Sequence, residues 1–344
     1  MIYKEGPMIR LGINGFGRIG RQVLKAAMER YPDTLAVAAI NDLFDAETNA
    51  HLMQYDTNYG IFGATVAVRK DGFRINDQLI RNFAFRDPSA IPWDDEGVDI
   101  VIESTGLFRT EQKASAHLKA GAKKVIITAP GEDVDLTVVM GVNHRSYRPE
   151  KHHIISNASC TTNCLAPPAL AVHKSYGIIN GMMTTIHSYT NDQRILDLPH
   201  RDLRRARAAG QNIIPTSTGA ARALALVIPE MKGRFDGYSL RVPTPTVSVV
   251  DFTAQLEKKT TTEELRNTLI AASKRMLKGI MACEWKQLVS SDYKGNAHSS
   301  IVDLEFTQVL NGTIAKVVAW YDNEWGYSCR VADLANYIAG KKLR

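Results

Sequence analysis

A glycine-rich turn between an apolar strand and a helix constrains the fold of this chain more than any other feature. Residues 9–13 are an apolar run, residues 14–20 read Asn-Gly-Phe-Gly-Arg-Ile-Gly, and a helical pattern extends from Arg18 to about Arg30. This is the G-x-G-x-x-G arrangement in a strand–turn–helix setting. The glycines let the backbone turn tightly and approach a pyrophosphate at the helix N-terminus. The stretch therefore predicts a dinucleotide-binding unit.

Asp42 ends the second predicted strand, residues 35–40, about 20 residues after the glycine turn. A carboxylate at this offset accepts a hydrogen bond from the ribose 2′-hydroxyl of NAD and repels the 2′-phosphate of NADP. The following residues, Leu43 and Phe44, offer nothing to receive a phosphate. A simple strand-end turn is the alternative reading of Asp42. With the glycine motif present, the sequence favours NAD.

Strands and helices alternate through the rest of the first half. A hairpin is predicted over residues 64–75, buried strands over 98–102 and 124–127, and a helix over 110–121. Such alternation is typical of a doubly wound sheet with helices on both faces.

Strands dominate from Tyr238 onward, over residues 239–242, 246–256, 300–310 and 313–321, with a tight turn at Asn311-Gly312. One helix follows a capping box formed by Thr261 and Glu264, and a terminal helix starts at about Ser328. The predicted fold class is therefore α/β, with an N-terminal doubly wound Rossmann-type domain and an α+β catalytic domain whose sheet is mostly antiparallel.

Cys160 is a candidate nucleophile. A short strand over residues 153–155 precedes it, and Ser159 or Asn157 can cap a helix that starts there. The positive end of a helix dipole favours the thiolate, which attacks carbonyl carbon. The alternative is a small buried cysteine with no reactivity. Two prolines at 167 and 168 predict a kink or a restart of this helix.

His187 lies in a predicted strand over residues 181–188 and is a candidate base for Cys160, although a lone histidine is more often structural. The polar segment 189–211 is open to three readings: a solvated loop with the first turns of a helix, an anion-binding or subunit-contact loop, or, less favoured, a nucleic-acid site. Its arginines are Arg194, Arg201, Arg204, Arg205 and Arg207. Residues 215–221 offer hydroxyls and backbone N–H groups at a helix start, a second possible phosphate seat.

Composition sets broad limits. A chain of 344 residues accommodates two domains. Four cysteines make no disulfide framework, which suits a reducing cytoplasm, and no ligand clustering indicates a metal site. No apolar run is long enough to cross a bilayer, and residues 1–7 lack the apolar region of a secretory signal. The net charge of +6 suits anionic small molecules as well as nucleic acid.

From residue 9 to the terminal helix, the chain resembles the phosphorylating glyceraldehyde-3-phosphate dehydrogenase family, NAD-dependent type. Six stretches in order carry the resemblance: residues 14–20, 158–164, 187–193, 202–208, 240–244 and 320–327. The extension 1–7 and the paired prolines depart from the family pattern.

The resemblance implies roles for individual residues. Cys160 matches the family nucleophile and His187 its base. Positions matching the NAD contacts are Gly15, Phe16, Gly17, Arg18, Ile19, Asp42, Arg86, Thr128 and Asn323. Thr190 and Arg241 match the seat for the substrate phosphate. Ser159, Thr161, Thr218 and Gly219 match the seat for inorganic phosphate, with Arg205 close by.

The resemblance also implies an NAD-binding domain of residues 1–158 and 323–344, a catalytic domain of residues 159–322, and a cytoplasmic homotetramer acting in glycolysis. The terminal helix is expected to return to the NAD-binding domain. Leu198-Pro199, with Leu43, resembles the NAD-specific branch.

The expected reaction is oxidative phosphorylation of glyceraldehyde 3-phosphate to 1,3-bisphosphoglycerate through a Cys160 hemithioacetal and thioester, with inorganic phosphate as co-substrate. A His187 imidazolium is expected to stabilise the thiolate beforehand. The alternatives are erythrose-4-phosphate dehydrogenase and, less favoured, a scaffold that binds RNA or protein.

Overall fold

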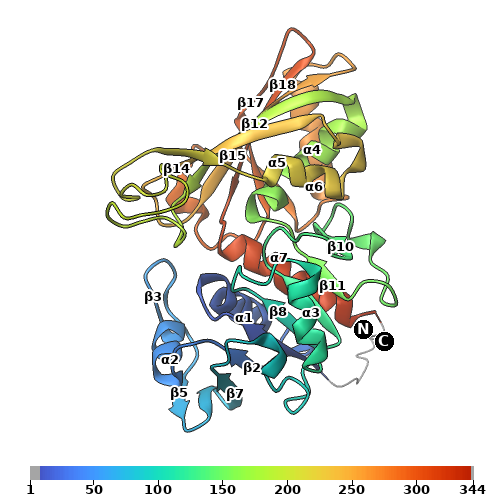
Figure 1. The fold of residues 1–344 in the computed structure, drawn as a ribbon. Helices are drawn as coiled ribbons and strands as arrows, with labels where there is room; N and C mark the ends of the chain where they lie inside the picture. The colour runs from blue at the N-terminus through green and yellow to red at the C-terminus, as the bar shows by residue number, and fades with distance from the viewer. Residues whose placement is uncertain (1–7, 342–344) are drawn as a thin grey trace. The chain divides into compact units, whose positions relative to one another are not determined.

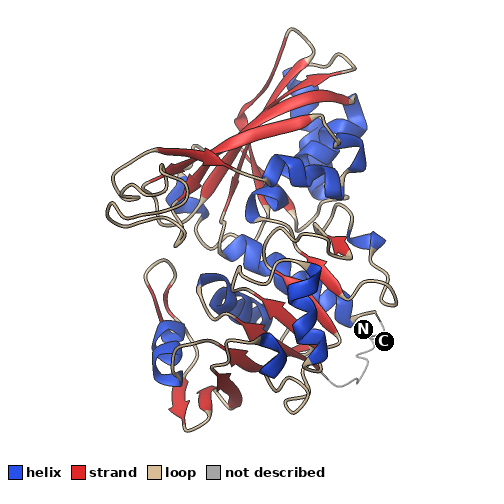
Figure 2. Ribbon diagram, in the orientation of Figure 1, coloured by secondary structure: helices blue, strands red, loops and turns tan. Residues whose placement is uncertain are grey.

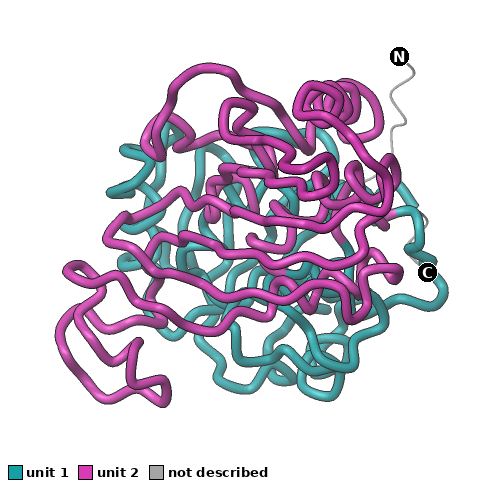
Figure 3. Tube along the Cα trace, turned by 90° about the horizontal axis from the view of Figure 1, so that it is seen from above, with its two compact units in different colours: residues 1–138, 145–158, 328–344 teal, residues 139–144, 159–327 magenta. Residues whose placement is uncertain are grey.

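The computed structural model describes residues 8–341, so the N-terminal extension lies outside the described residues. The chain divides into two compact units (Figure 3). The first comprises the chain up to Val138, Arg145–Ala158 and the chain from Ser328 on. The second comprises Val139–His144 and Ser159–Tyr327.

The first unit is built on a nine-stranded sheet in the order β10-β11-β9-β8-β1-β2-β7-β6-β5 (Figure 1). Its strands are β1 (Ile9–Asn14), β2 (Leu35–Asn41), β5 (Val66–Arg69), β6 (Gly72–Ile75), β7 (Gln78–Phe83), β8 (Ile100–Glu103), β9 (Lys124–Ile127), β10 (Leu136–Thr137) and β11 (Ile154–Ser156). Pairing is parallel from β10 to β7 and antiparallel in the β5–β6–β7 meander. Strands β8, β9 and β11 are buried along their whole length, and most of their residues are apolar.

Helices α1 (Arg18–Arg30), α2 (Ala46–Gln54) and α3 (Glu111–Lys119) complete this unit, together with a two-stranded ribbon of β3 (Tyr55–Asp56) and β4 (Gly60–Ile61). Helix α1 packs against β2, and α3 packs against β9 and β11. The predicted doubly wound sheet is confirmed. Helix α2 and strand β7 were not predicted from the sequence.

The terminal helix α7 (Trp325–Ala339) lies beside α1 in Figure 1. Asp333 Oδ1 accepts hydrogen bonds from Arg30 Nη2 (3.0 Å) and Tyr31 Oη (2.7 Å). These bonds join the end of the chain to the end of α1, so the residues from Ser328 onward belong to the first unit.

The second unit contains a seven-stranded sheet in the order β13-β14-β12-β15-β18-β17-β16 (Figure 2). Its strands are β12 (Ile178–Ser188), β13 (Ile214–Ser217), β14 (Phe235–Val242), β15 (Ser248–Leu256), β16 (Met281–Glu284), β17 (Ser300–Leu310) and β18 (Ile314–Tyr321). Only the β12–β14 and β16–β17 pairs are parallel within the described sheet, so the predicted mostly antiparallel sheet is confirmed.

Helices α4 (Cys160–Tyr176), α5 (Ala220–Val227) and α6 (Thr262–Lys274) pack against this sheet. The predicted capping box is present: Thr261 Oγ1 accepts from Glu264 N, and the Glu264 carboxylate accepts from Thr261 N. The predicted hairpin turn is present as well, with positive φ at Asn311 and Gly312.

Of the kink or restart predicted at the two prolines, a restart of the helix is wrong. Helix α4 runs unbroken through Pro167 and Pro168. Every side chain from Thr161 to Val172 is buried, and the helix packs against α5, α6 and four strands of the sheet. This packing outweighs the backbone hydrogen bonds that proline cannot make.

Two further segments differ from expectation. Residues 189–211 form no helix; they fold back as an irregular loop in which Ala209 N donates to Arg194 O (2.8 Å). Residues 214–217 form strand β13, and the helix start that was predicted over 215–221 is at Ala220. No helix among residues 8–341 has the length and apolar character needed to cross a membrane.

Candidate active site

Cys160 occupies the first position of helix α4. Ala158 has a left-handed backbone (φ 54°), which is uncommon for a residue with a side chain. Ser159 is the N-cap, and its Oγ accepts a hydrogen bond from Thr162 N at 3.0 Å. Of the two caps that the sequence allowed, the structure selects Ser159.

His187 stands beside this cysteine, near the end of β12. Its Nε2 lies 3.5 Å from Cys160 Sγ. Its Nδ1 lies 2.7 Å from the carbonyl oxygen of Ser188, which can only accept, so Nδ1 carries the proton. Nε2 of the neutral ring is then an acceptor facing the thiol, which is the geometry of a general base and its nucleophile.

The protonation expected from the sequence needs correction. Burial raises the pKa of the Cys160 thiol, although the Arg241 charge and hydrogen bonds involving Thr161 oppose this shift. Burial, reinforced by the Arg241 charge, lowers the pKa of His187 to about 3. Desolvation disfavours the charged form of both groups. Both shifts favour a thiol and a neutral imidazole over the expected thiolate and imidazolium.

Tyr321 is a site residue that the sequence analysis missed. Its hydroxyl lies 2.9 Å from Thr161 Oγ1 and 2.9 Å from Thr185 Oγ1, and its ring meets the His187 ring edge-on. Burial raises the pKa of Tyr321 well above its usual range, so the phenol stays protonated. The strict alternation of buried residues in β18 could have placed Tyr321 on the inner face.

Arg241 is a candidate anion ligand in the same unit. Its Nη1 donates to Thr190 Oγ1 (3.0 Å) and to the Ser188 carbonyl (3.3 Å). Its Nε is buried without a hydrogen-bond partner. A buried guanidinium nitrogen without a partner is costly unless a ligand atom completes it. The structure thus brings Thr190 and Arg241 together, as the resemblance implied.

The second predicted anion seat is partly engaged in local structure. Arg205 donates from Nε to Thr216 Oγ1 (2.9 Å) and pairs with Asp192, and its charge still contributes to lowering the pKa of His187. Thr218 Oγ1 accepts from Ala220 N (3.2 Å) at the start of α5. Gly219 is the exposed N-cap, and a Cβ there would meet nothing within 4 Å. The Thr161 hydroxyl is bonded to Tyr321.

Asn323 follows the end of β18. Its Oδ1 accepts hydrogen bonds from Ser188 Oγ (2.9 Å) and Ser248 Oγ (3.1 Å). The two serines were not among the predicted site residues, although Ser188 lies in the stretch 187–193 that carries part of the resemblance.

The other predicted cofactor contacts belong to the first unit and lie around the glycine turn. Gly15 has φ 88°, and a Cβ there would lie 2.7 Å from Thr105 N. A Cβ on Gly20 would lie 2.2 Å from Gly15 O, whereas one on Gly17 would meet nothing within 4 Å. Two glycines therefore permit the turn itself, and the third leaves open space beside the backbone at the start of α1. This arrangement fits a pyrophosphate.

Asp42 supports the same turn. Its Oδ2 accepts from Phe16 N at 2.8 Å, and its Oδ1 accepts from Phe44 N at 3.1 Å. The carboxylate is only partly buried and retains lone pairs for a ribose hydroxyl. Asp42 thus has a structural bond in addition to the ligand contact that the sequence suggested.

The remaining predicted contacts vary in their surroundings. Arg18 opens α1, with its Nη1 2.7 Å from Asp56, and Ile19 follows it in the first turn. Thr128 follows β9, and its N–H donates to Glu103 O (2.9 Å). Arg86 is exposed. Among residues 8–341, no group of three or more His, Cys, Asp or Glu side chains could hold a metal ion.

Comparison with known proteins identifies relatives of both units. Residues 159–323 match the family model of the C-terminal domain of glyceraldehyde 3-phosphate dehydrogenase, and residues 9–111 match that of its NAD binding domain. A glyceraldehyde-3-phosphate dehydrogenase of Geobacillus stearothermophilus is 57% identical over 335 residues, which cover 97% of this chain and 99% of the relative. Proteins of the same name from Priestia megaterium and, as form 2, from Trichormus variabilis are each 54% identical over 335 residues with the same coverage. The chain belongs to the glyceraldehyde-3-phosphate dehydrogenase family.

Proposed function

We propose that this protein oxidises and phosphorylates glyceraldehyde 3-phosphate to 1,3-bisphosphoglycerate with NAD as oxidant. The observation that carries the proposal is the 3.5 Å contact between Cys160 Sγ and an accepting Nε2 of His187, next to the buried, unpartnered Nε of Arg241. A nucleophile, a base and an anion ligand are thereby gathered in one unit. The names of the three relatives support the three-carbon substrate over erythrose 4-phosphate.

The residues around the glycine turn would hold NAD. Gly15, Phe16, Gly17, Arg18 and Ile19 offer backbone at the start of α1 for the pyrophosphate, and Asp42 would accept from the adenosine ribose. Arg86, Thr128 and, from the second unit, Asn323 are proposed as further contacts. NAD, when bound, supplies the acceptor for the hydride that leaves the substrate.

The first step is addition of Cys160 Sγ to the aldehyde carbon, which gives a hemithioacetal. Because Cys160 is a thiol and His187 is neutral, the thiol proton passes to His187 Nε2 as the S–C bond forms. The Ser188 carbonyl holds His187 Nδ1–H throughout, so the ring does not rotate away. The Arg241 charge, which opposes the rise in the pKa of Cys160, favours the developing thiolate.

Oxidation leaves a thioester on Cys160. His187 Nε2 first returns the thiol proton to the aldehyde oxygen, which becomes the hemithioacetal hydroxyl. The neutral ring then takes that hydroxyl proton as the hydride leaves the carbon and the carbonyl re-forms. A thioester retains more of the oxidation energy than an oxygen ester would, and phosphate can therefore capture it as an acyl phosphate.

Phosphate then attacks the thioester and releases the Cys160 sulfur. Two anions must be bound at once, the phosphate of the substrate and the inorganic phosphate. Thr190 and Arg241 would hold the first, supported by their 3.0 Å contact. Ser159, Thr161, Thr218 and Gly219, with Arg205, would hold the second, supported by the open backbone at Gly219 and the charge that Arg205 exerts on His187.

We further propose a division into an NAD-binding domain (1–158 and 323–344) and a catalytic domain (159–322). The two compact units differ from it chiefly at residues 139–144 and 323–327.

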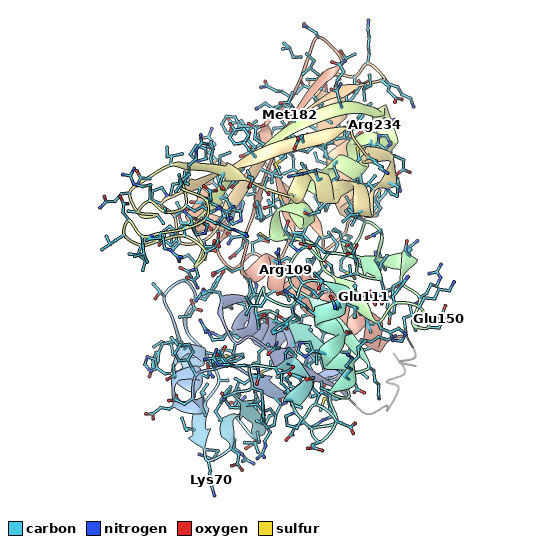
Figure 4. All side chains as sticks on the ribbon, viewed as in Figure 1. Lys70, Arg109, Glu111, Glu150, Met182 and Arg234 are labelled. Carbon is cyan, nitrogen blue, oxygen red and sulfur yellow. The ribbon has the colours of Figure 1, made fainter. Side chains whose placement is uncertain are left out.

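We also propose a cytoplasmic homotetramer. Exposed apolar side chains on the loop 189–211 support self-association, because Ile195 is 87% exposed and Leu203 81% exposed. Met182, on β12, is a further exposed apolar residue (62%) and is labelled in Figure 4. All four thiols are free, which suits a reducing compartment. Light scattering after size-exclusion chromatography tests the tetramer, and a monomer would contradict it.

The experiment for the reaction is NAD reduction followed at 340 nm with each aldehyde, with and without inorganic phosphate. We expect glyceraldehyde 3-phosphate to give the higher kcat/KM and turnover to depend on phosphate. A preference for erythrose 4-phosphate, with acid released by water, would assign the protein to the other reaction. No reduction of NAD with either aldehyde would contradict the proposal as a whole.

A further inference from the structure

Two buried serines hold the carboxamide of Asn323. Ser188 ends β12, Ser248 begins β15 and Asn323 follows β18, so the three residues come from the ends of neighbouring strands. Ser188 Oγ and Ser248 Oγ lie 2.9 Å and 3.1 Å from Asn323 Oδ1. Ser188 and Ser248 are 0% and 2% exposed, so water does not compete for these bonds.

A backbone N–H group, which can only donate, determines the direction of these hydrogen bonds. The backbone N–H of Ser188 donates to Ser248 Oγ at 3.1 Å. Ser248 Oγ therefore accepts at that point and has its own proton available for Asn323 Oδ1. The hydroxyl proton of Ser188 has the same acceptor. Both lone pairs of Oδ1 are thus engaged, and the Asn323 amino group is turned the other way.

A rotated carboxamide would break this arrangement. If Asn323 turned by 180°, its amino group would face both hydroxyls, and Ser248 Oγ would have to accept two hydrogen bonds. Both serine protons would then lose the acceptor that they have among residues 8–341, in a buried place where an unmatched donor is unfavourable. As the structure stands, Asn323 Nδ2 forms no hydrogen bond with any other described residue, so its two N–H groups are available to a ligand.

The backbone before Ser248 carries strain that fits this role. Val247 has φ 69°, a left-handed conformation that is a genuine outlier for a β-branched residue. It is 3% exposed and packs with Tyr293 and Ile301, which hold it in place. It also ends the predicted strand 246–256 early, so β15 begins at Ser248. Strain of this kind persists where the surrounding packing enforces it.

We propose that Ser188 and Ser248 are positioning residues that present Asn323 as a donor and thereby select a cofactor with a hydrogen-bond acceptor, the carboxamide oxygen of nicotinamide. The proposal rests on the proposed role of Asn323 as a cofactor contact. The Ser188 carbonyl also accepts hydrogen bonds from His187 and Arg241. Ser188 thus orients the base His187 through its backbone and Asn323 through its side chain.

The test compares the dissociation constant of NAD with that of 3-aminopyridine adenine dinucleotide, in which an amino group replaces the carboxamide. The analogue presents donors where NAD presents an acceptor, and it cannot be reduced, so binding alone is measured by isothermal titration calorimetry. We expect the wild-type enzyme to prefer NAD by about tenfold or more, since donor faces donor in the analogue complex. In the double variant Ser188→Ala/Ser248→Ala, Asn323 can rotate and accept a hydrogen bond from the analogue. We therefore expect the preference for NAD over the analogue to fall to within about threefold.

Three further variants make the result decisive. Ser299→Ala is the matched control, because Ser299 is a buried serine of the same unit whose hydroxyl has no partner; it keeps the wild-type preference. Asn323→Ala loses it. Ser188→Ala alone gives an intermediate preference, and it also serves if the double variant does not fold.

A preference that persists in both serine variants but is lost in Asn323→Ala would overturn the positioning role. A loss in Ser299→Ala as large as in the serine pair would overturn it too, by assigning the effect to packing. A preference that persists in Asn323→Ala would instead contradict the cofactor contact on which the proposal rests.

Discussion

At the scale of single residues, the Ser188 carbonyl explains much of the chemistry of the site. It accepts from His187 Nδ1 at 2.7 Å, where many general bases have a carboxylate partner. A neutral carbonyl fixes the tautomer but stabilises an imidazolium less than a carboxylate would. Burial and the charges of Arg241 and Arg205 lower the pKa of His187, and the hydrogen bond to the Ser188 carbonyl opposes this shift only in part, so the ring serves as a neutral base.

The Arg241 charge predicts a change in the pH dependence of Cys160 reactivity. Arg241 opposes the rise in the pKa of Cys160 that burial causes. In Arg241→Gln, the thiol pKa therefore rises further, and the rate of alkylation by iodoacetamide follows the thiolate to higher pH. At a fixed pH below the pKa we expect alkylation to slow roughly three- to tenfold. Arg222→Gln, which changes an exposed arginine of the same unit, is the control. Equal profiles for wild type and Arg241→Gln would refute the prediction.

Asp42 predicts a change in cofactor choice. Asp42→Asn keeps an oxygen for the Phe16 N–H but removes the charge that would repel a 2′-phosphate. We expect the ratio of kcat/KM for NAD to that for NADP to fall at least about tenfold, because like charges brought together in a binding site cost several kcal/mol. The measurement is a pair of steady-state assays at one ionic strength. An unchanged ratio would show that Asp42 serves the turn alone.

At the scale of elements, the sequence predicted those features that local chemistry determines. The glycine turn, the capping box at Thr261 and the Asn311-Gly312 hairpin all have short-range causes, and each is present. Helix α4 was misjudged because its continuity through Pro167 and Pro168 depends on packing against distant segments. The predicted strand 246–256 began too early for the same reason. Val247 has a left-handed conformation that tertiary contacts hold in place, and such contacts cannot be inferred from local sequence.

The site was predictable to a similar extent. Cys160, His187 and Arg241 could be named from motifs and resemblance. The contacts of Tyr321 with Thr161 and Thr185 join residues more than a hundred positions apart in sequence, and no local pattern reports them. The pKa shifts of the Cys160–His187 pair were missed because burial is a property of the folded unit.

The capping box of α6 predicts a measurable contribution to stability. Thr261→Ala removes the Oγ1 that accepts from Glu264 N and should destabilise the protein by about 1 kcal/mol. Thr261→Ser retains the hydroxyl and should lie close to wild type. Urea unfolding followed by circular dichroism gives both values. If the alanine and serine variants unfold alike, the cap contributes nothing to global stability.

At the scale of the whole molecule, each unit contains its own long-range ties. In the first unit, Asp56 binds Arg18 Nη1 (2.7 Å) and Gln22 Nε2 (2.9 Å) and so joins the β3–β4 ribbon to helix α1. Burial alone would raise the pKa of Asp56, but the hydrogen bond and charge of Arg18, with two backbone N–H groups, lower it overall. The Asp56 carboxylate therefore binds a proton less readily in the native state than in the unfolded chain.

This difference predicts how stability depends on pH. A carboxylate whose pKa is lowered on folding stabilises the protein fully above its ordinary pKa of 3.8 and loses that effect as pH falls through the lower native value. Asp56→Asn should thus cost about 1–3 kcal/mol at pH 7. The difference from wild type should shrink below about pH 4. Urea unfolding at several pH values measures both. A difference that stays constant down to pH 3 would exclude an ionised Asp56 as its source.

The central claim is that Cys160 carries an acyl group that inorganic phosphate removes. The most direct measurement is intact-protein mass spectrometry after rapid mixing with NAD and glyceraldehyde 3-phosphate in phosphate-free buffer, followed by peptide mapping. We predict an added 3-phosphoglyceroyl mass on the peptide containing Cys160, its loss within one turnover when phosphate is added, and its absence in Cys160→Ser. NADH formation with no adduct on Cys160, or an adduct that phosphate does not discharge, would contradict the account.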